Sequence, residues 1–154
     1  MTDYFTVLEQ QRKPWLDPQE LKEKYHGLAR RSQPDQNVNE AYRVLVDPKL
    51  RLQHLLTLEG APPSASSTEI PEELADLFMA IAPTLHKIDM VDATHVDELI
   101  NQVRDLNEET LADVRAIDAN WNKRLSEIEK LYRRISYLSR WLELLEERRF
   151  QLSI

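Results

Sequence analysis

The side chains that could take part in binding chemistry gather between residues 17 and 35. Basic and imidazole side chains recur there every four residues, which places them on one face of a helix: Lys22, His26 and Arg30. Lys24 and Arg31 add positive charge, and a polar turn follows at residues 32–35. A basic helix face beside a rigid turn could dock an acidic protein surface. The same pattern also fits a helix face that is merely solvated.

Residues for most other kinds of chemistry are missing. The chain has no cysteine, so disulfides, thiolate metal sites and cysteine nucleophiles are excluded. Its two glycines are too few for phosphate-binding loops. The four histidines show no metal-ligand spacing or paired carboxylate, and no Ser/His/Asp order stands out. We therefore expect no enzyme, no metal and no cofactor.

Composition indicates an all-α protein. Leucine occurs 23 times, against 8 valines and 8 isoleucines, which favours helix over strand. The net charge of −7 and the pI of about 5.1 argue against a nucleic-acid partner. The first residues lack the pattern of a secretory signal, and no apolar run approaches the roughly 20 residues of a membrane helix. We expect a cytoplasmic protein without a membrane partner.

The chain divides near residue 60. Residues 1–60 hold 9 basic and 9 acidic side chains, whereas residues 61–154 hold 11 and 18. An uncharged stretch rich in proline and serine separates them and reads as a linker. We therefore predict a small helical domain over 1–60, a linker over 61–70 and a second domain over 71–154.

Capping residues and apolar periodicity predict the helices of both parts. Asp17-Pro18 starts a helix that runs to about Ser32, and Asp47-Pro48 separates two shorter helices, at 38–46 and 48–59. The second part predicts helices that begin near Pro71, over 94–117 and over 120–149, packed as an antiparallel three-helix bundle. Pro83 predicts a kink or an early end in the first of these.

A second candidate site lies on the last predicted helix. Tyr137, Trp141 and Leu144 fall off its main apolar stripe and share a second face at i, i+4 and i+7. Aromatic residues on a surface, flanked by arginines, are typical of a protein-binding hot spot. Alternatively, this helix is central and buries both faces.

Several segments, taken in order, resemble a J-domain: Tyr4-Phe5 with Leu8, residues 22–31 (KEKYHGLARR), Gln33-Pro34-Asp35 and residues 39–48 (NEAYRVLVDP). The continuation at 51–60 (RLQHLLTLEG) is similar to the J-domain of HscB co-chaperones, which serve iron–sulphur cluster assembly. Residues 134–138 (RISYL) resemble the final helix of the HscB C-terminal domain, and 118–121 (DANW) the turn before it. The resemblance spans nearly the whole chain and is weakest over 61–115.

The resemblance implies two partners, a DnaK/HscA-type chaperone and an iron–sulphur scaffold protein that is delivered to it as client. It assigns the chaperone-binding face to Lys22, Tyr25, Arg30, Arg31, Gln33, Pro34 and Asp35. It assigns the client-binding face to Leu77, Phe78, Ile81, Tyr137 and Trp141.

The sequence departs from the J-domain pattern at two points. The family's His-Pro-Asp turn is Gln33-Pro34-Asp35 here, and glutamine cannot carry the charge of an imidazolium. Only three residues separate Asp35 from Asn39, so the third helix is shortened and something else, such as the second domain, must cover the helix before it. Two alternatives therefore stay open: a J-like regulator that does not stimulate ATP hydrolysis, and a helical adaptor unrelated to chaperones.

Overall fold

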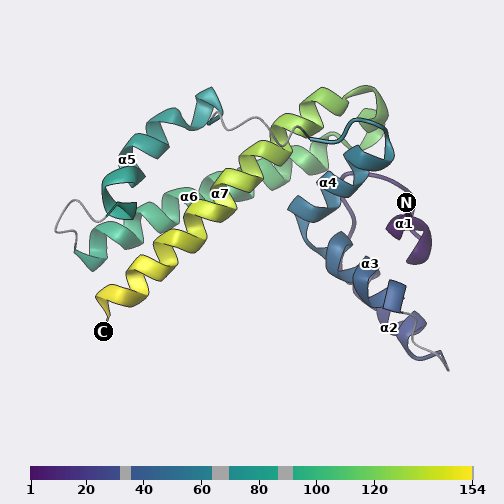
Figure 1. Cartoon of the computed structure of the whole chain (residues 1–154). Coiled ribbons are helices and arrows are strands. Elements are labelled where there is room, and N and C mark those ends of the chain that lie inside the picture. The colour runs from purple at the N-terminus through teal and green to yellow at the C-terminus, as the bar shows by residue number, and fades with distance from the viewer. Residues whose placement is uncertain (32–35, 64–69, 87–91, 154) are drawn as a thin grey trace. The chain divides into compact units, whose positions relative to one another are not determined.

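The computed structural model describes residues 1–31, 36–63, 70–86 and 92–153, and the regular structure in these ranges is helical (Figure 1). This confirms the all-α class. The amino-terminal helices are α1 (Tyr4–Val7), α2 (Pro18–Ala29), α3 (Gln36–Val46) and α4 (Pro48–Leu58). The later elements are the 3-10 turn η1 (Glu72–Leu74), α5 (Ala75–Leu85), α6 (Ala93–Ala116), the 3-10 segment η2 (Asp118–Lys123) and α7 (Leu125–Leu152).

Aspartate caps start α2 and α4, as the sequence predicts. The Asp17 carboxylate accepts hydrogen bonds from the backbone N–H groups of Gln19, at 2.9 Å, and Glu20, at 3.3 Å. Asp47 does the same at the start of α4, and a proline follows each cap. The far end of α2 differs from the expectation, because the helix ends at Ala29 with Arg30 as its C-cap.

The chain forms two compact units. The first comprises Met1–Ser64 together with Asp113–Tyr132, and the second comprises Ala65–Ala112 together with Arg133–Ile154. Helices α6 and α7 therefore each contribute to both units. The domain limits expected from the sequence stay a prediction, and they did not include the contribution of residues 113–132 to the first unit.

The first unit is held by a leucine-rich core and two buried polar side chains. The guanidinium of Arg51 donates to the backbone oxygens of Pro14, at 2.7 Å, and Leu45, at 2.8 Å. Burial lowers the pKa of Arg51 to about 10. Arg51 thus ties the segment before α2 to the end of α3, and the carbonyl oxygens satisfy donors that would be costly to leave unpaired.

The second buried polar side chain of this unit is His54, which is 9% exposed. Its Nε2 accepts a hydrogen bond from the backbone N–H of Tyr4 at 3.1 Å. The ring stacks on that of Phe5, with centroids 5.8 Å apart. An acceptor at Nε2 requires the neutral imidazole, so His54 fixes the start of α1 on α4 only while it is uncharged.

The second unit is centred on α5, α6 and α7, whose apolar stripes meet in one buried cluster. Its members are Leu74, Ile81, Val96, Leu99, Ile100, Val103, Leu138, Trp141 and Leu145. Most of these are the periodic residues from which the three helices were predicted. Trp121 was expected at the start of the last helix but lies in η2, before α7 begins.

Pro83 does not end α5 early, contrary to one of the two outcomes expected for it. The helix runs two residues further, to Leu85. Proline at this position cannot donate to the carbonyl of Met79, one turn earlier. Met79 is 71% exposed, so water can reach that turn and satisfy the carbonyl.

Candidate protein-binding surfaces

The first surface is the exposed, basic side of α2. Lys22, Arg30 and Arg31 are all exposed, as is His26, so the positive face predicted from the spacing is present. Lys24 forms an ion pair with Glu9, and its hydrogen bond and charge hold the pKa of that carboxyl below its usual value. The remaining cations of the helix lie in solvent, where they attract anionic groups over about a Debye length.

Tyr25 links this surface to α3. Its hydroxyl donates to Oδ1 of Asn39 at 2.6 Å, and its ring stacks on Tyr42 with centroids 4.2 Å apart. Leu21, one turn earlier on α2, is 1% exposed. The inner side of α2 is therefore covered within its own unit, where α3 contacts it, and the expected need for a cover from elsewhere does not arise at these residues.

Three residues assigned to the chaperone-binding face, Gln33, Pro34 and Asp35, lie outside the described residues. What the structure gives is the position of the two helix ends that they join. α2 ends at Ala29 and α3 begins at Gln36, so residues 32–35 follow directly on the exposed Arg30 and Arg31.

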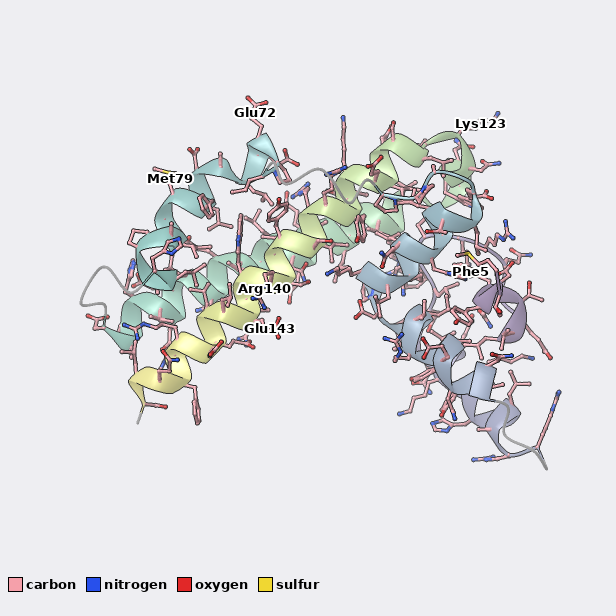
Figure 2. The ribbon with its side chains drawn as sticks, viewed as in Figure 1. Phe5, Glu72, Met79, Lys123, Arg140 and Glu143 are labelled. Carbon is pink, nitrogen blue, oxygen red and sulfur yellow. The ribbon has the colours of Figure 1, made fainter. Side chains whose placement is uncertain are left out.

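The second surface is a groove between α5 and α7 with a volume of about 540 Å³. From α5 and its C-cap come Phe78, Leu85 and His86, and from α7 come Tyr137, Arg140, Trp141, Leu144, Glu147, Arg148 and Gln151. The residues of α7 recur every three or four positions and form a continuous stripe along the helix. Figure 2 labels Met79 on α5 and Arg140 on α7, both in the second unit.

The structure brings together three of the five residues assigned to the client-binding face. Phe78 and Tyr137 each lie against Trp141, with ring centroids 5.8 Å and 5.7 Å away. Trp141 is only 4% exposed, so it forms the floor of the groove and not the exposed aromatic surface considered for it. Ile81 is fully buried in the core, and Leu77 packs against that core outside the groove lining.

Comparison with known proteins gives two structures similar to nearly the whole chain, although no family model and no curated protein matches its sequence. Human co-chaperone protein HscB has a TM-score of 0.78 and 22% identity, over 99% of this chain and 84% of that one. Chaperone HscB from Vibrio cholerae has a TM-score of 0.70 and 16% identity, over 98% of this chain and 99% of that one. The chain has the HscB fold.

The HscB fold confirms the architecture that the sequence resemblance implied, including over 61–115, where that resemblance was weakest. The matched region includes α2, α5 and α7. Both comparisons lie below 25% identity, so they concern the fold, and a fold does not by itself determine a function.

Sequence reasoning missed the far end of the groove. Arg148 continues the spacing of Tyr137, Trp141 and Leu144 by one more turn, and Leu85 repeats the position of Phe78 two turns later. Both follow from periodicity once the two helices are known to face each other. The sequence alone did not show that α5 continues beyond Pro83 to bring Leu85 there.

A second, polar hollow on the HscB fold lies between α6 and α7 and has its charges already paired. Arg104 bonds Glu146 at 2.8 Å, and Arg149 bonds Asp97 at 2.9 Å. Because these ion pairs already neutralise the charged side chains of the hollow, its polar lining does not indicate a ligand site. Within the described ranges we find no group of three metal-ligating side chains, and no helix there is long and apolar enough to span a bilayer.

Proposed function

We propose that this protein is a J-domain-type co-chaperone of iron–sulphur cluster assembly. It docks a DnaK/HscA-type chaperone through α2 and the turn after it, and it presents an iron–sulphur scaffold protein in the α5–α7 groove. The observation that carries the proposal is the HscB fold over 99% of the chain. Such a protein acts by binding, without an active site of its own, and we assign it to the cytoplasm.

The chaperone-binding surface is electrostatic. Lys22, Arg30 and Arg31 offer exposed cations to an acidic surface, which speeds association and orients the partner. Tyr25 acts differently, since its hydrogen bond to Asn39 fixes the register of α2 against α3. The chaperone face is thus a rigid basic helix that leads into the turn at Gln33, Pro34 and Asp35.

The client-binding surface is apolar and aromatic. Phe78 and Tyr137 are partly exposed, and each packs against the buried ring of Trp141. Aromatic side chains that are already packed lose little conformational freedom when a partner covers them, which makes them efficient binding anchors.

The test is single-turnover ATP hydrolysis by the DnaK-type chaperones of the same organism. The natural protein is compared with Gln33→His, with the double variant Arg30→Glu/Arg31→Glu, and with Lys123→Glu. Lys123 is an exposed lysine of η2, and its substitution reverses a charge away from α2. We expect stimulation by the natural protein, loss of stimulation in the double variant, and full activity in the Lys123 control.

Gln33 favours a second candidate function, a J-like regulator that occupies the chaperone without stimulating it. Glutamine can hydrogen-bond but cannot supply an imidazolium charge. Stimulation by Gln33→His alone would support that regulator. If neither the natural protein nor Gln33→His stimulates ATP hydrolysis or binds the chaperone, both co-chaperone functions are contradicted. The remaining candidate is then a helical adaptor unrelated to chaperones.

A further inference from the structure

The α5–α7 groove changes character along its length. Near Tyr137 it is aromatic, whereas its far end carries Arg148 beside Leu144 and Gln151. Its lining holds two arginines, Arg140 and Arg148, and one carboxylate, Glu147. Across the whole lining the arginines outnumber the carboxylate by one, and this excess positive charge above an apolar floor disfavours a basic segment.

Of the two arginines in the groove lining, Arg148 is the one without a carboxylate partner among the described residues. Its side chain is partly buried, and its Nε is inaccessible to solvent without a hydrogen-bond partner. A terminal nitrogen of Arg148 donates a long hydrogen bond, 3.4 Å, to Oε1 of Gln151. Because Nε cannot be reached from solvent, an incoming carboxylate would pair with the terminal guanidinium nitrogens, where a charge-assisted hydrogen bond is stronger than the long bond to Gln151.

Three other arginines of the second unit have carboxylate partners. Arg149, the next residue, bonds Asp97 at 2.9 Å, and Arg104 bonds Glu146 at 2.8 Å, both in the polar hollow on the other side of α7. Arg140 has Glu143 at 3.6 Å on its own helix, and Figure 2 labels both side chains on α7. Among the residues that the structure describes, the groove thus retains one partly buried arginine without a carboxylate partner.

The geometry also limits the shape of the occupant. From Tyr137 to Arg148 the stripe spans 11 residues of α7, or about 16 Å at 1.5 Å per residue. A groove lined by two helices suits a third helix, whose apolar residues at i, i+3, i+4 and i+7 match the spacing of the lining. Three turns of helix cover the distance from the aromatic end to Arg148.

We propose that the groove binds an amphipathic helix whose apolar stripe lies over Trp141 and whose carboxylate, about three turns along, pairs with Arg148. This deepens the proposed function and rests on it, because it states the chemistry of the scaffold segment that the groove takes. The carboxylate sets the direction of the bound helix, since only one orientation brings it to the arginine.

Labelled peptides test this without the scaffold protein. Three helical peptides of about 16 residues share one leucine stripe and end in two glutamates, two glutamines or two lysines. Fluorescence anisotropy measures their affinity for the full chain and for Arg148→Gln, Arg148→Glu and Lys130→Gln. Lys130 is an exposed lysine on α7 outside the groove, so its variant is the matched control. Circular dichroism verifies that each variant is folded.

We expect the glutamate peptide to bind the natural chain and the Lys130→Gln control about tenfold more tightly than the glutamine peptide. The preference should vanish in Arg148→Gln and reverse toward the lysine peptide in Arg148→Glu. Equal affinity of the three peptides for the natural chain, or binding of none of them, overturns the proposal. So does a concentration-dependent dimer that the peptides do not dissociate, because a second copy would then occupy the groove.

A parallel titration with the purified iron–sulphur scaffold protein of the same organism separates the two levels of inference. If the glutamate peptide binds through Arg148 but the scaffold does not bind, the proposed function fails and the chemistry of the groove stands. If the scaffold binds and the peptides show no charge preference, only the role of Arg148 is overturned.

Discussion

At the scale of single residues, His54 is a buried group whose charge state bears on the fold. It accepts the N–H of Tyr4 through Nε2 and stacks on Phe5. Burial lowers the pKa of His54 below its ordinary value of 6.5; the charge of Asp3 opposes this shift, and the charge of Arg12 adds to it. A charged imidazolium could not accept the hydrogen bond, so protonation favours the unfolded chain.

The expected result is a loss of stability as the pH falls. Above 6.5, the ordinary pKa, His54 is neutral in both states; below it the unfolded chain takes up a proton that the folded chain resists. The free energy of unfolding, from urea titrations between about pH 7.5 and 5, should therefore decrease. In His54→Gln, whose Oε1 can accept the same N–H, the decrease should be smaller. An identical pH dependence of the two proteins would contradict this role.

At the scale of elements, the groove depends on two aromatic side chains that come from different helices. Phe78→Ala and Tyr137→Ala should each weaken scaffold binding by about 1–3 kcal/mol, the range of interface hot spots. Phe150→Ala is the matched control, because Phe150 is 66% exposed on α7 and outside the groove. Calorimetric titration measures the affinities. Equal weakening by all three variants would show that the groove is not the contact.

The sequence predicted where the helices lie better than it predicted how they pack against one another. The caps at Asp17 and Asp47 and the periodic leucines define helices by local rules, and those rules held. Burial of Trp141 could not be settled this way, because a helix with two apolar faces is equally compatible with a surface stripe. The sequence also could not predict that α5 continues past Pro83, because this depends on whether the preceding turn is exposed to water.

At the scale of the whole molecule, α7 contributes to two cores. Ile128 is fully buried and belongs to the first unit, whereas Leu138, ten residues later, is fully buried in the cluster of the second. Val114 and Ile117, from the end of α6 and the residue that follows it, are also buried within the first unit. The guanidinium of Arg115 lies 4.4 Å from the ring centre of Trp15 there. The amino-terminal helices therefore share their core with residues far along the chain.

This arrangement predicts that two similar substitutions on one helix act on different units. Ile128→Ala and Leu138→Ala each remove a fully buried aliphatic side chain, at an expected cost of about 2–5 kcal/mol. Hydrogen exchange should show that Ile128→Ala lowers amide protection in α2–α4 more than in α5, and that Leu138→Ala does the reverse. Equal losses everywhere would mean that the chain unfolds as one cooperative unit. A selective loss would show that α7 stabilises the two units through separate cores.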